Sequence, residues 1–309
     1  MPTLLYSHPA CLRHDTGPHH PERPDRLRAI LAVLETESFA LLQRREAPRA
    51  EKAQLLRVHP EWYVDWLLSQ IPKDGLAGID ADTVVSPGSG EAALRAAGAV
   101  CAAVDAVVGG EARNAFCAVR PPGHHAEPEQ AMGFCLFNNV AIAAQHARAA
   151  HGLTRIAVID FDVHHGNGTQ AAFERDADLF YASTHQSPLY PGTGHPHEHG
   201  IANNVVNAPL PPAAGSAEFR RAMEAIVLPA LDAFAPELVL ISAGFDAHRR
   251  DPLAALNLVE DDYAWITRKL CEIAERHAKG RIVSALEGGY DLQALAASVA
   301  AHVDVLMSG

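Results

Sequence analysis

The chain has 309 residues, with 25 basic and 37 acidic side chains and a formal net charge of −12. This length permits one large α/β domain or two small ones, and a hydrophobic content of 48% is enough for a large core. The charge argues against binding to nucleic acid, which needs clustered Lys and Arg to neutralise phosphates. It would instead attract cationic substrates such as lysine-rich peptides and polyamines.

Features along the chain bear on its cellular setting. The N-terminal residues lack a basic region followed by a long apolar stretch, so we expect no secretory signal. The most apolar helical stretch, near 92–108, is interrupted by Arg95 and Asp105, which argues against a membrane span. Five cysteines without a C-x-x-C pair indicate reduced thiols and a cytoplasmic location. No linker or repeat divides the chain, so we expect a single domain over 1–309.

Apolar strands and helical patterns alternate from one end to the other. In chain order we expect a strand near 3–7, helices over 24–35, 52–69 and 90–108, a strand over 115–119, a helix over 136–150, strands over 155–161 and 179–183, a helix over 216–234, a strand over 237–242, a helix over 260–278, a strand over 281–286 and a helix over 291–306. This order predicts an α/β fold with a mainly parallel sheet and helices on both faces. Long loops at 8–22, 72–89 and 185–213 are of a length that usually shapes a binding site.

The segment from Asp160 to His164 carries the strongest chemical signal. It reads Asp-Phe-Asp-Val-His and follows a buried apolar run. If the chain stays extended there, Asp160, Asp162 and His164 point to the same side, because side chains repeat every two residues. A carboxylate with a neutral imidazole is a normal partial ligand shell for Zn²⁺. In isolation, the pattern is equally typical of a charged strand end followed by a helix-capping Asn.

Three other expected strands also run into reactive side chains. The groups that follow them are His124 and His125 after 115–119, Asp246 after 237–242, and Tyr290 after 281–286. In open α/β sheets, sites form in the crevice beyond the carboxyl ends of the strands. A purely structural chain has no reason to place all of these groups there, so we expect them to converge.

Together these segments resemble the zinc-dependent histone deacetylases and their bacterial deacetylase and amidohydrolase relatives, with class II-like features. The matching segments, in family order, are HPERPDRL (20–27), RPPGHHAE (120–127), GFCLFNN (133–139), DFDVHHGNG (160–168), YPGTG (190–194), SAGFDAHRRDPL (242–253) and LEGGYDL (286–292). They cover almost the whole chain. The resemblance implies the arginase/deacetylase-like fold, with the active site at the C-terminal strand ends.

The resemblance also implies roles for the reactive residues. Asp162, His164 and Asp246 would bind a catalytic Zn²⁺ and leave positions open for water and the substrate oxygen. His125 would act as the general base and then as the acid that protonates the leaving amine. His124 would give electrostatic support.

Partners for the two histidines follow in the same way. The family pairs His124 with a carboxylate, here Asp160, and His125 with residue 167. That residue is Asn167, as in the class II branch, whereas the class I branch has Asp. A neutral amide orients His125 without strongly favouring its protonated form. Tyr290, which follows two glycines, would stabilise the developing oxyanion.

Four residues match the family's substrate channel. Phe134 and Tyr190 correspond to two aromatic walls of a narrow tunnel, which are usually both Phe. Gly133 corresponds to a backbone acceptor for the substrate amide. Leu253 stands where polyamine-preferring relatives can carry Glu, and Leu there favours acyl-lysine over acylpolyamine.

Two further ion sites come into question, a K⁺ site and a second metal site. The resemblance implies a structural K⁺ at Asp160, Asp162, His164 and Ser183. The alternating histidines within 195–199 are more typical of a solvated loop than of a second metal site.

The sequence thus predicts a zinc-dependent amide hydrolase that removes acetyl or other acyl groups from lysine side chains of proteins or peptides. One alternative is an amidohydrolase of acetylpolyamines or other cationic acylated small molecules. A second alternative is a non-catalytic acyl-lysine reader. A reader would be expected to lose Tyr290, a histidine of the pair or a metal ligand, and none is missing.

Overall fold

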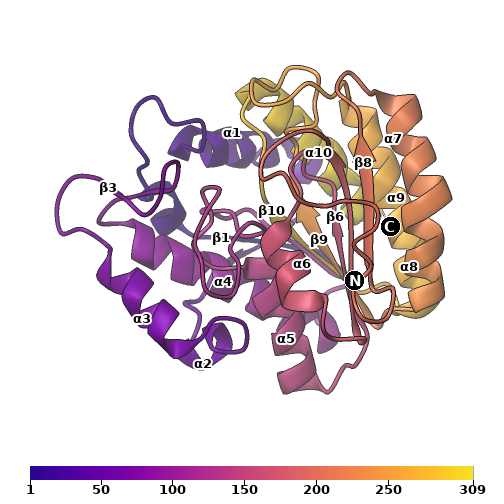
Figure 1. The fold of residues 1–309 in the computed structure, drawn as a ribbon, viewed down its shortest axis with the longest axis horizontal. Coiled ribbons are helices and arrows are strands. Elements are labelled where there is room, and N and C mark those ends of the chain that lie inside the picture. Colours follow the sequence, from indigo (N-terminus) through magenta and orange to yellow (C-terminus); the bar gives the residue numbers. More distant parts are fainter. Residues whose placement is uncertain (309) are drawn as a thin grey trace.

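Eight strands form a central sheet in which every pairing is parallel (Figure 1). The computed structural model describes residues 1–308. The strands are β1 (Thr3–Ser7), β2 (Gln43–Glu46), β5 (Asn114–Cys117), β6 (Ile156–Asp160), β7 (Leu179–Gln186), β8 (Val205–Leu210), β9 (Leu238–Ala243) and β10 (Ile282–Leu286). They lie in the spatial order β2-β1-β5-β10-β9-β6-β7-β8. The predicted α/β architecture is confirmed.

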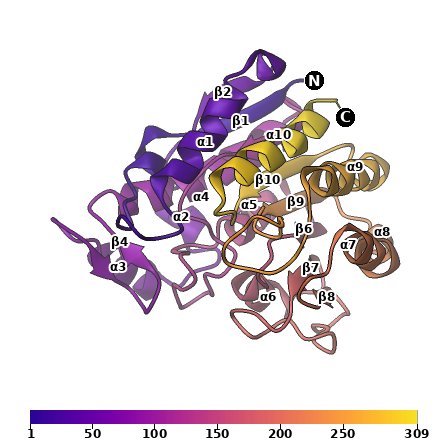
Figure 2. The ribbon, with the colours of Figure 1, turned by 90° about the horizontal axis from the view of Figure 1, so that it is seen from above.

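Helices cover both faces of this sheet, as the view from above shows (Figure 2). On one face lie α1 (Pro24–Leu34), α7 (Ser216–Ala222), α8 (Leu228–Phe234), α9 (Glu260–His277) and α10 (Leu292–Ser308). On the other face lie α4 (Ser89–Val108), α5 (Asn139–His151) and α6 (Asn167–Phe173). Beside them are two short helices, α2 (Lys52–Leu55) and α3 (Glu61–Ser69), and a small hairpin of β3 (Ala77–Gly78) and β4 (Val84–Val85).

The central strands are apolar throughout because helices cover both of their sides. Every residue of β6 and β9 is buried. The helices have identifiable ends: the Asn138 side chain accepts a hydrogen bond from Ala141 N at the start of α5. Gly152, with φ of 67°, ends the same helix in the left-handed conformation.

The 20-residue helix α4 is a core helix. It packs on β1, β5 and β10, and most of its residues are buried. Gly98 allows close approach, since a Cβ there would collide with the backbone of residues 48–50. Among residues 1–308, no helix is both long and apolar enough to cross a membrane.

Several predicted element boundaries were wrong. The expected helix 52–69 is two helices, because Pro60 interrupts the hydrogen-bond ladder between them. The expected loop 185–213 contains the strand β8. Pro209 is tolerated within this strand because β8 lies at the edge of the sheet. The other edge strand, β2, reads Gln-Arg-Arg-Glu and is fully exposed, so it carries no apolar signal.

The strand order explains how distant motifs meet. β5, β10, β9 and β6 are adjacent, although β5 and β10 are far apart in the chain. Since all four run parallel, their carboxyl ends open on one edge, and the segments that follow them share one crevice.

Candidate metal and acid–base site

Two carboxylates and an imidazole converge beyond the ends of β6 and β9. One ligand atom from each of Asp162, His164 and Asp246 lies within 4.8 Å of the others. His164 Nδ1 lies 3.0 Å from Asp162 Oδ1 and 3.1 Å from Asp246 Oδ2. All three side chains are buried. Two neighbouring carboxylates in such a place need a cation nearby, and this donor set fits Zn²⁺.

Backbone groups hold the two carboxylates in place. Gly288 N donates to Asp162 Oδ2 at 2.8 Å, and Val163 N donates to Asp246 Oδ1 at 2.8 Å. A side chain at Gly288 would collide with both carboxylates, which explains why this position is glycine. These hydrogen bonds fix Asp162 Oδ2 and Asp246 Oδ1, while Asp162 Oδ1 and Asp246 Oδ2 lie next to His164 Nδ1.

The expected alternation along an extended strand is wrong. β6 ends at Asp160, and residues 162–164 form bends. Asp160 Oδ1 accepts a hydrogen bond from Asp162 N, and Asp162 Oδ1 accepts one from His164 N, so short Asp turns replace the strand. As a result Asp160 turns away from the metal cluster, and Asp246 takes its place.

The His124–His125 pair lies against this cluster, with ring centroids 4.1 Å apart. His124 Nδ1 lies 2.9 Å from Asp160 Oδ2, and His125 Nδ1 lies 2.8 Å from Asn167 Oδ1. Both rings are buried. The structure therefore places both predicted partners as the sequence analysis expected.

The two histidines have opposite electrostatic environments. Burial opposes a charge on His124, but the carboxylates of Asp160 and Asp162 outweigh it and raise the pKa of His124 well above 6.5. Burial, followed by the neighbouring His124 and His164, holds the pKa of His125 well below 6.5. His124 is thus suited to carry a positive charge, whereas neutral His125 can accept a proton.

Glu287 is a buried carboxyl that the sequence analysis missed. Its Oε2 accepts hydrogen bonds from Gly123 N at 2.7 Å and His124 N at 3.1 Å, and Ser242 Oγ donates to Oε1 at 3.2 Å. Burial raises the pKa of Glu287 to about 7. Glu287 anchors the turn that carries the histidine pair, and its position directly after β10 was the available signal.

A buried network of hydrogen bonds and ion pairs holds the turn that carries Tyr290. Arg26 Nε donates to Gly289 O at 2.6 Å, and its guanidinium carbon lies 4.8 Å from the centre of the Tyr290 ring. Glu22 pairs with Arg26 at 2.9 Å and with Arg120 at 2.5 Å. These contacts give the HPERPDRL segment a structural role in fixing the Gly-Gly-Tyr turn.

Asp251 ties two predicted site residues together. Its Oδ2 accepts a hydrogen bond from Tyr290 N at 2.7 Å, and its Oδ1 accepts one from Leu253 N at 3.0 Å. Burial raises the pKa of Asp251 to about 6. The sequence analysis did not single out Asp251, because a lone Asp in an Arg-Arg-Asp-Pro loop is usually a solvated surface residue.

A cavity of about 230 Å³ opens onto the histidines. Its lining is Asp82, Pro122, His124, His125, Gly133, Phe134, His164, Leu189, Tyr190, Leu253, Gly288 and Tyr290. All four predicted channel residues are among them. Asp82 was missed, because it lies in the loop 72–89 with no motif around it.

Aromatic rings and one glycine shape this cavity. The Phe134 and Tyr290 rings meet edge-on at 6.0 Å, and the Tyr190 ring meets His125 at 5.1 Å. Gly133 has φ of 56°, and a Cβ there would lie 2.5 Å from His125 Cδ2. Glycine at 133 thus lets the wall of the cavity lie directly against the His125 ring.

Two residues of the expected K⁺ site, Asp160 and Ser183, are neighbours in the sheet. Ser183 pairs with Asp160 across β6 and β7. Its Oγ lies 2.9 Å from His185 Nδ1. The K⁺ site at Asp160, Asp162, His164 and Ser183 stays a prediction.

Comparison with known proteins agrees with this geometry. The model of the histone deacetylase domain family matches residues 20–306. A histone deacetylase-like amidohydrolase of Pseudomonas aeruginosa is 41% identical, over 93% of this chain and 81% of that protein. A probable deacetylase of Archaeoglobus fulgidus is 40% identical, over 95% of this chain and 82% of that protein. The solved HDA15 HD domain superimposes with a TM-score of 0.94 at 37% identity, covering 99% of this chain and 90% of that one. The chain therefore belongs to the histone deacetylase family.

Proposed function

We propose that the protein is a zinc-dependent deacylase that hydrolyses the side-chain amide of acyl-lysine in proteins or peptides. Membership of the histone deacetylase family supports deacetylase or amidohydrolase chemistry. The observation that carries the proposal is the position of His125, a buried neutral imidazole that lines the cavity beside three side chains able to bind a metal ion.

Asp162, His164 and Asp246 would hold the metal. When bound, Zn²⁺ polarises the acyl oxygen and lowers the pKa of a water molecule. The protein's own groups provide the proton transfers and the stabilisation of charge. Their arrangement assigns one task to each.

Hydrogen bonding decides which nitrogen of His125 reacts. Asn167 Nδ2 donates to Glu127 Oε1 at 2.8 Å, so its Oδ1 faces His125 and accepts the proton on Nδ1. His125 Nε2 is left with a lone pair on the cavity side. It takes a proton from water as the water oxygen attacks the acyl carbon.

Collapse of the tetrahedral species breaks the carbon–nitrogen bond. His125 returns its proton to the leaving nitrogen, so the direct products are a carboxylic acid and the lysine amine; the acid then gives its proton to the amine, leaving a carboxylate and an ammonium ion. Tyr290 donates its hydroxyl hydrogen bond to the oxygen that becomes negative during attack. Burial raises the pKa of the Tyr290 phenol well above 10, which keeps this donor protonated.

The cavity supports lysine as the group that enters. Phe134 and Tyr190 suit a methylene stem, and Leu253 provides no carboxylate for a distant ammonium. Asp82 adds a carboxylate to the lining, which can accept a hydrogen bond from a substrate amide. An acetylpolyamine would use the same machinery and is the alternative outcome of the test.

The test combines metal removal with paired substrates. Chelation should abolish hydrolysis of an acetyl-lysine peptide, and added Zn²⁺ should restore it. Asp162→Asn should lose the metal while remaining folded, whereas Asp74→Asn, a change at an exposed carboxylate, should behave as wild type. Full activity in a sample verified to be free of metal would contradict the proposal. Faster turnover of N8-acetylspermidine than of the peptide would replace the lysine assignment with the polyamine one.

A further inference from the structure

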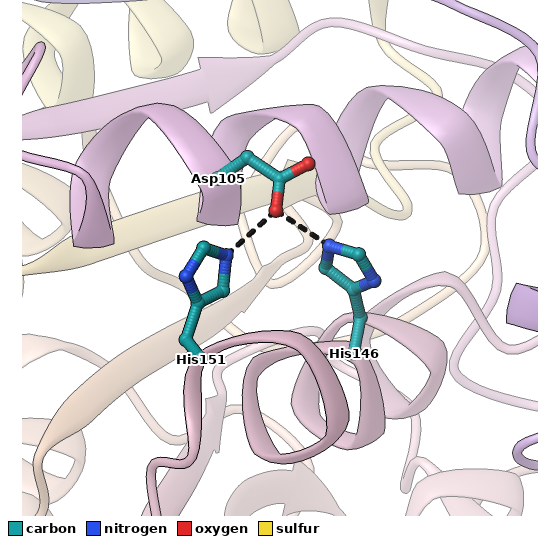
Figure 3. Close-up of side chains that lie close together, drawn as sticks. All are labelled: Asp105, His146 and His151. Atoms are coloured by element: carbon teal, nitrogen blue, oxygen red, sulfur yellow. Dashed lines mark hydrogen bonds and ion pairs between the residues drawn. The ribbon is translucent and has the colours of Figure 1, made fainter.

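A second group of metal-ligating side chains lies between α4 and α5 (Figure 3). Asp105 comes from the last turn of α4, while His146 and His151 come from α5. Asp105 Oδ1 lies 2.6 Å from His146 Nε2 and 2.7 Å from His151 Nε2. One ligand atom of each residue lies within 4.8 Å of the other two. The catalytic cavity is lined by different residues.

We propose that Asp105, His146 and His151 form a second binding site for Zn²⁺. Two imidazole nitrogens and one carboxylate oxygen are a three-ligand set that leaves a position for water. Nitrogen donors select Zn²⁺ and similar transition-metal ions over Mg²⁺ and Ca²⁺, which prefer oxygen ligands. An ion held there would cross-link the ends of two helices that already pack against each other.

The ends of the two helices favour a cation at this cluster. His151 is the last residue of α5, and α4 ends at Val108, three residues after Asp105. Helix C-termini carry unpaired carbonyls and a partial negative charge, so both helix ends stabilise a cation placed near them.

The three ligands differ in burial, and this difference would help an ion to bind. The His146 side chain is 7% exposed and its ring is held in place, whereas Asp105 is 50% exposed. An ion can therefore reach the cluster from solvent and find one ligand already oriented. Donors around a tetrahedral ion lie roughly 3.3 Å apart, given bonds of about 2.0–2.1 Å. The closer contacts seen here must open slightly, and His151 at the helix end can move.

Arg57 competes with metal binding, which provides a sharp test. Its Nη1 lies 2.6 Å from His146 Nδ1. Because a guanidinium only donates, Nδ1 accepts and the ring proton sits on Nε2, facing Asp105. An ion at Nε2 requires that proton to move to Nδ1, where it would meet the Arg57 donor. Arg57 must then turn toward solvent, and removing it should strengthen metal binding.

The experiment counts bound zinc by mass spectrometry and measures affinity by titrating the holoenzyme with Zn²⁺. We expect His151→Ala and Asp105→Asn each to bind one zinc per chain fewer than wild type, with unchanged deacetylase activity. Arg57→Ala should bind this zinc about tenfold more tightly, the effect of losing one competing hydrogen bond. Melting temperatures measured in chelator would establish that the variants are folded.

His197→Ala is the matched control, because His195 and His197 stack their rings in a separate loop. It should keep the full zinc count. The inference is overturned if His151→Ala binds as much zinc as wild type, if His197→Ala loses the ion instead, or if Arg57→Ala fails to tighten binding. The two sites can be tested separately, because Asp162→Ala should lose the catalytic metal and keep the zinc that depends on His151.

Discussion

Asn167 decides how His125 is polarised, and a change of nearly identical shape can test this. Asn167 Oδ1 lies 2.8 Å from His125 Nδ1, and Asn167 Nδ2 donates to Glu127 Oε1 at 2.8 Å. Asn167→Asp preserves the first hydrogen bond but puts a negative charge beside the imidazole. The second contact becomes one between two carboxylates.

The added charge stabilises protonated His125. At about 4 Å, two unit charges interact by ~4 kcal/mol at an effective dielectric constant of 20, and an adjacent opposite charge commonly moves a pKa by about 1–3. Burial, His124 and His164 now hold the pKa of His125 well below 6.5, so the base is neutral at pH 7. Raising this pKa leaves less neutral base near and below neutrality. We expect the acid limb of the kcat/KM profile to move upward by about 1–3 pH units, with little loss at alkaline pH.

A stability cost accompanies this shift and can be separated from it. Losing the bond to Glu127 and creating a like-charge contact should destabilise the fold by about 1–3 kcal/mol. The double variant Asn167→Asp/Glu127→Gln restores a donor opposite the new carboxylate. It should regain stability while keeping the displaced acid limb, and Glu127→Gln alone should change neither.

The assay is the dependence of kcat/KM on pH between roughly pH 5 and 10, with urea unfolding measured in parallel. If the acid limb of both Asp-containing variants coincides with that of wild type, His125 is not the group whose protonation limits the reaction, and the reasoning is refuted. If the double variant keeps the displaced acid limb but does not regain stability, the contact with Glu127 is not the cause of the destabilisation.

Other variants probe the oxyanion contact, the substrate class and the core. Tyr290→Phe should retain its metal but lose about 10²–10³ in kcat, measured by steady-state kinetics and metal analysis; normal turnover would remove Tyr290 as the donor. Leu253→Glu should raise the kcat/KM for N8-acetylspermidine relative to an acetyl-lysine peptide by about tenfold, and an unchanged ratio would contradict a gatekeeping role. Burial lowers the pKa of His302 to about 3, so the stability owed to its neutral form is complete above pH 6.5 and is lost as pH falls toward 3. Between pH 7.5 and pH 5, His302 should lower the free energy of unfolding by about 2 kcal/mol, measured by urea unfolding, and His302→Gln should lack this pH-dependent loss.

Residue types and their spacing predicted the architecture, and the resemblance of seven segments to the histone deacetylases implied the chemistry. The central strands β6 and β9 were predicted from their continuous apolar runs, which arise because helices cover both faces. The edge strands were missed for the converse reason: β2 is polar and exposed, and β8 contains Pro209. Edge strands need few apolar residues, so their sequences resemble loops.

Two features of the reactive groups appeared only in the tertiary structure: the direction in which Asp160 points and the cluster of Asp105, His146 and His151. Alternation along an extended strand predicted that Asp160, Asp162 and His164 face the same side, yet bends after β6 turn Asp160 toward His124. Asp105 lies 41 and 46 positions from His146 and His151, a separation without any motif. Short-range spacing records which side chains share a turn or a strand. Contacts between separate elements depend on strand order and helix packing, which the long-range burial of apolar surface determines.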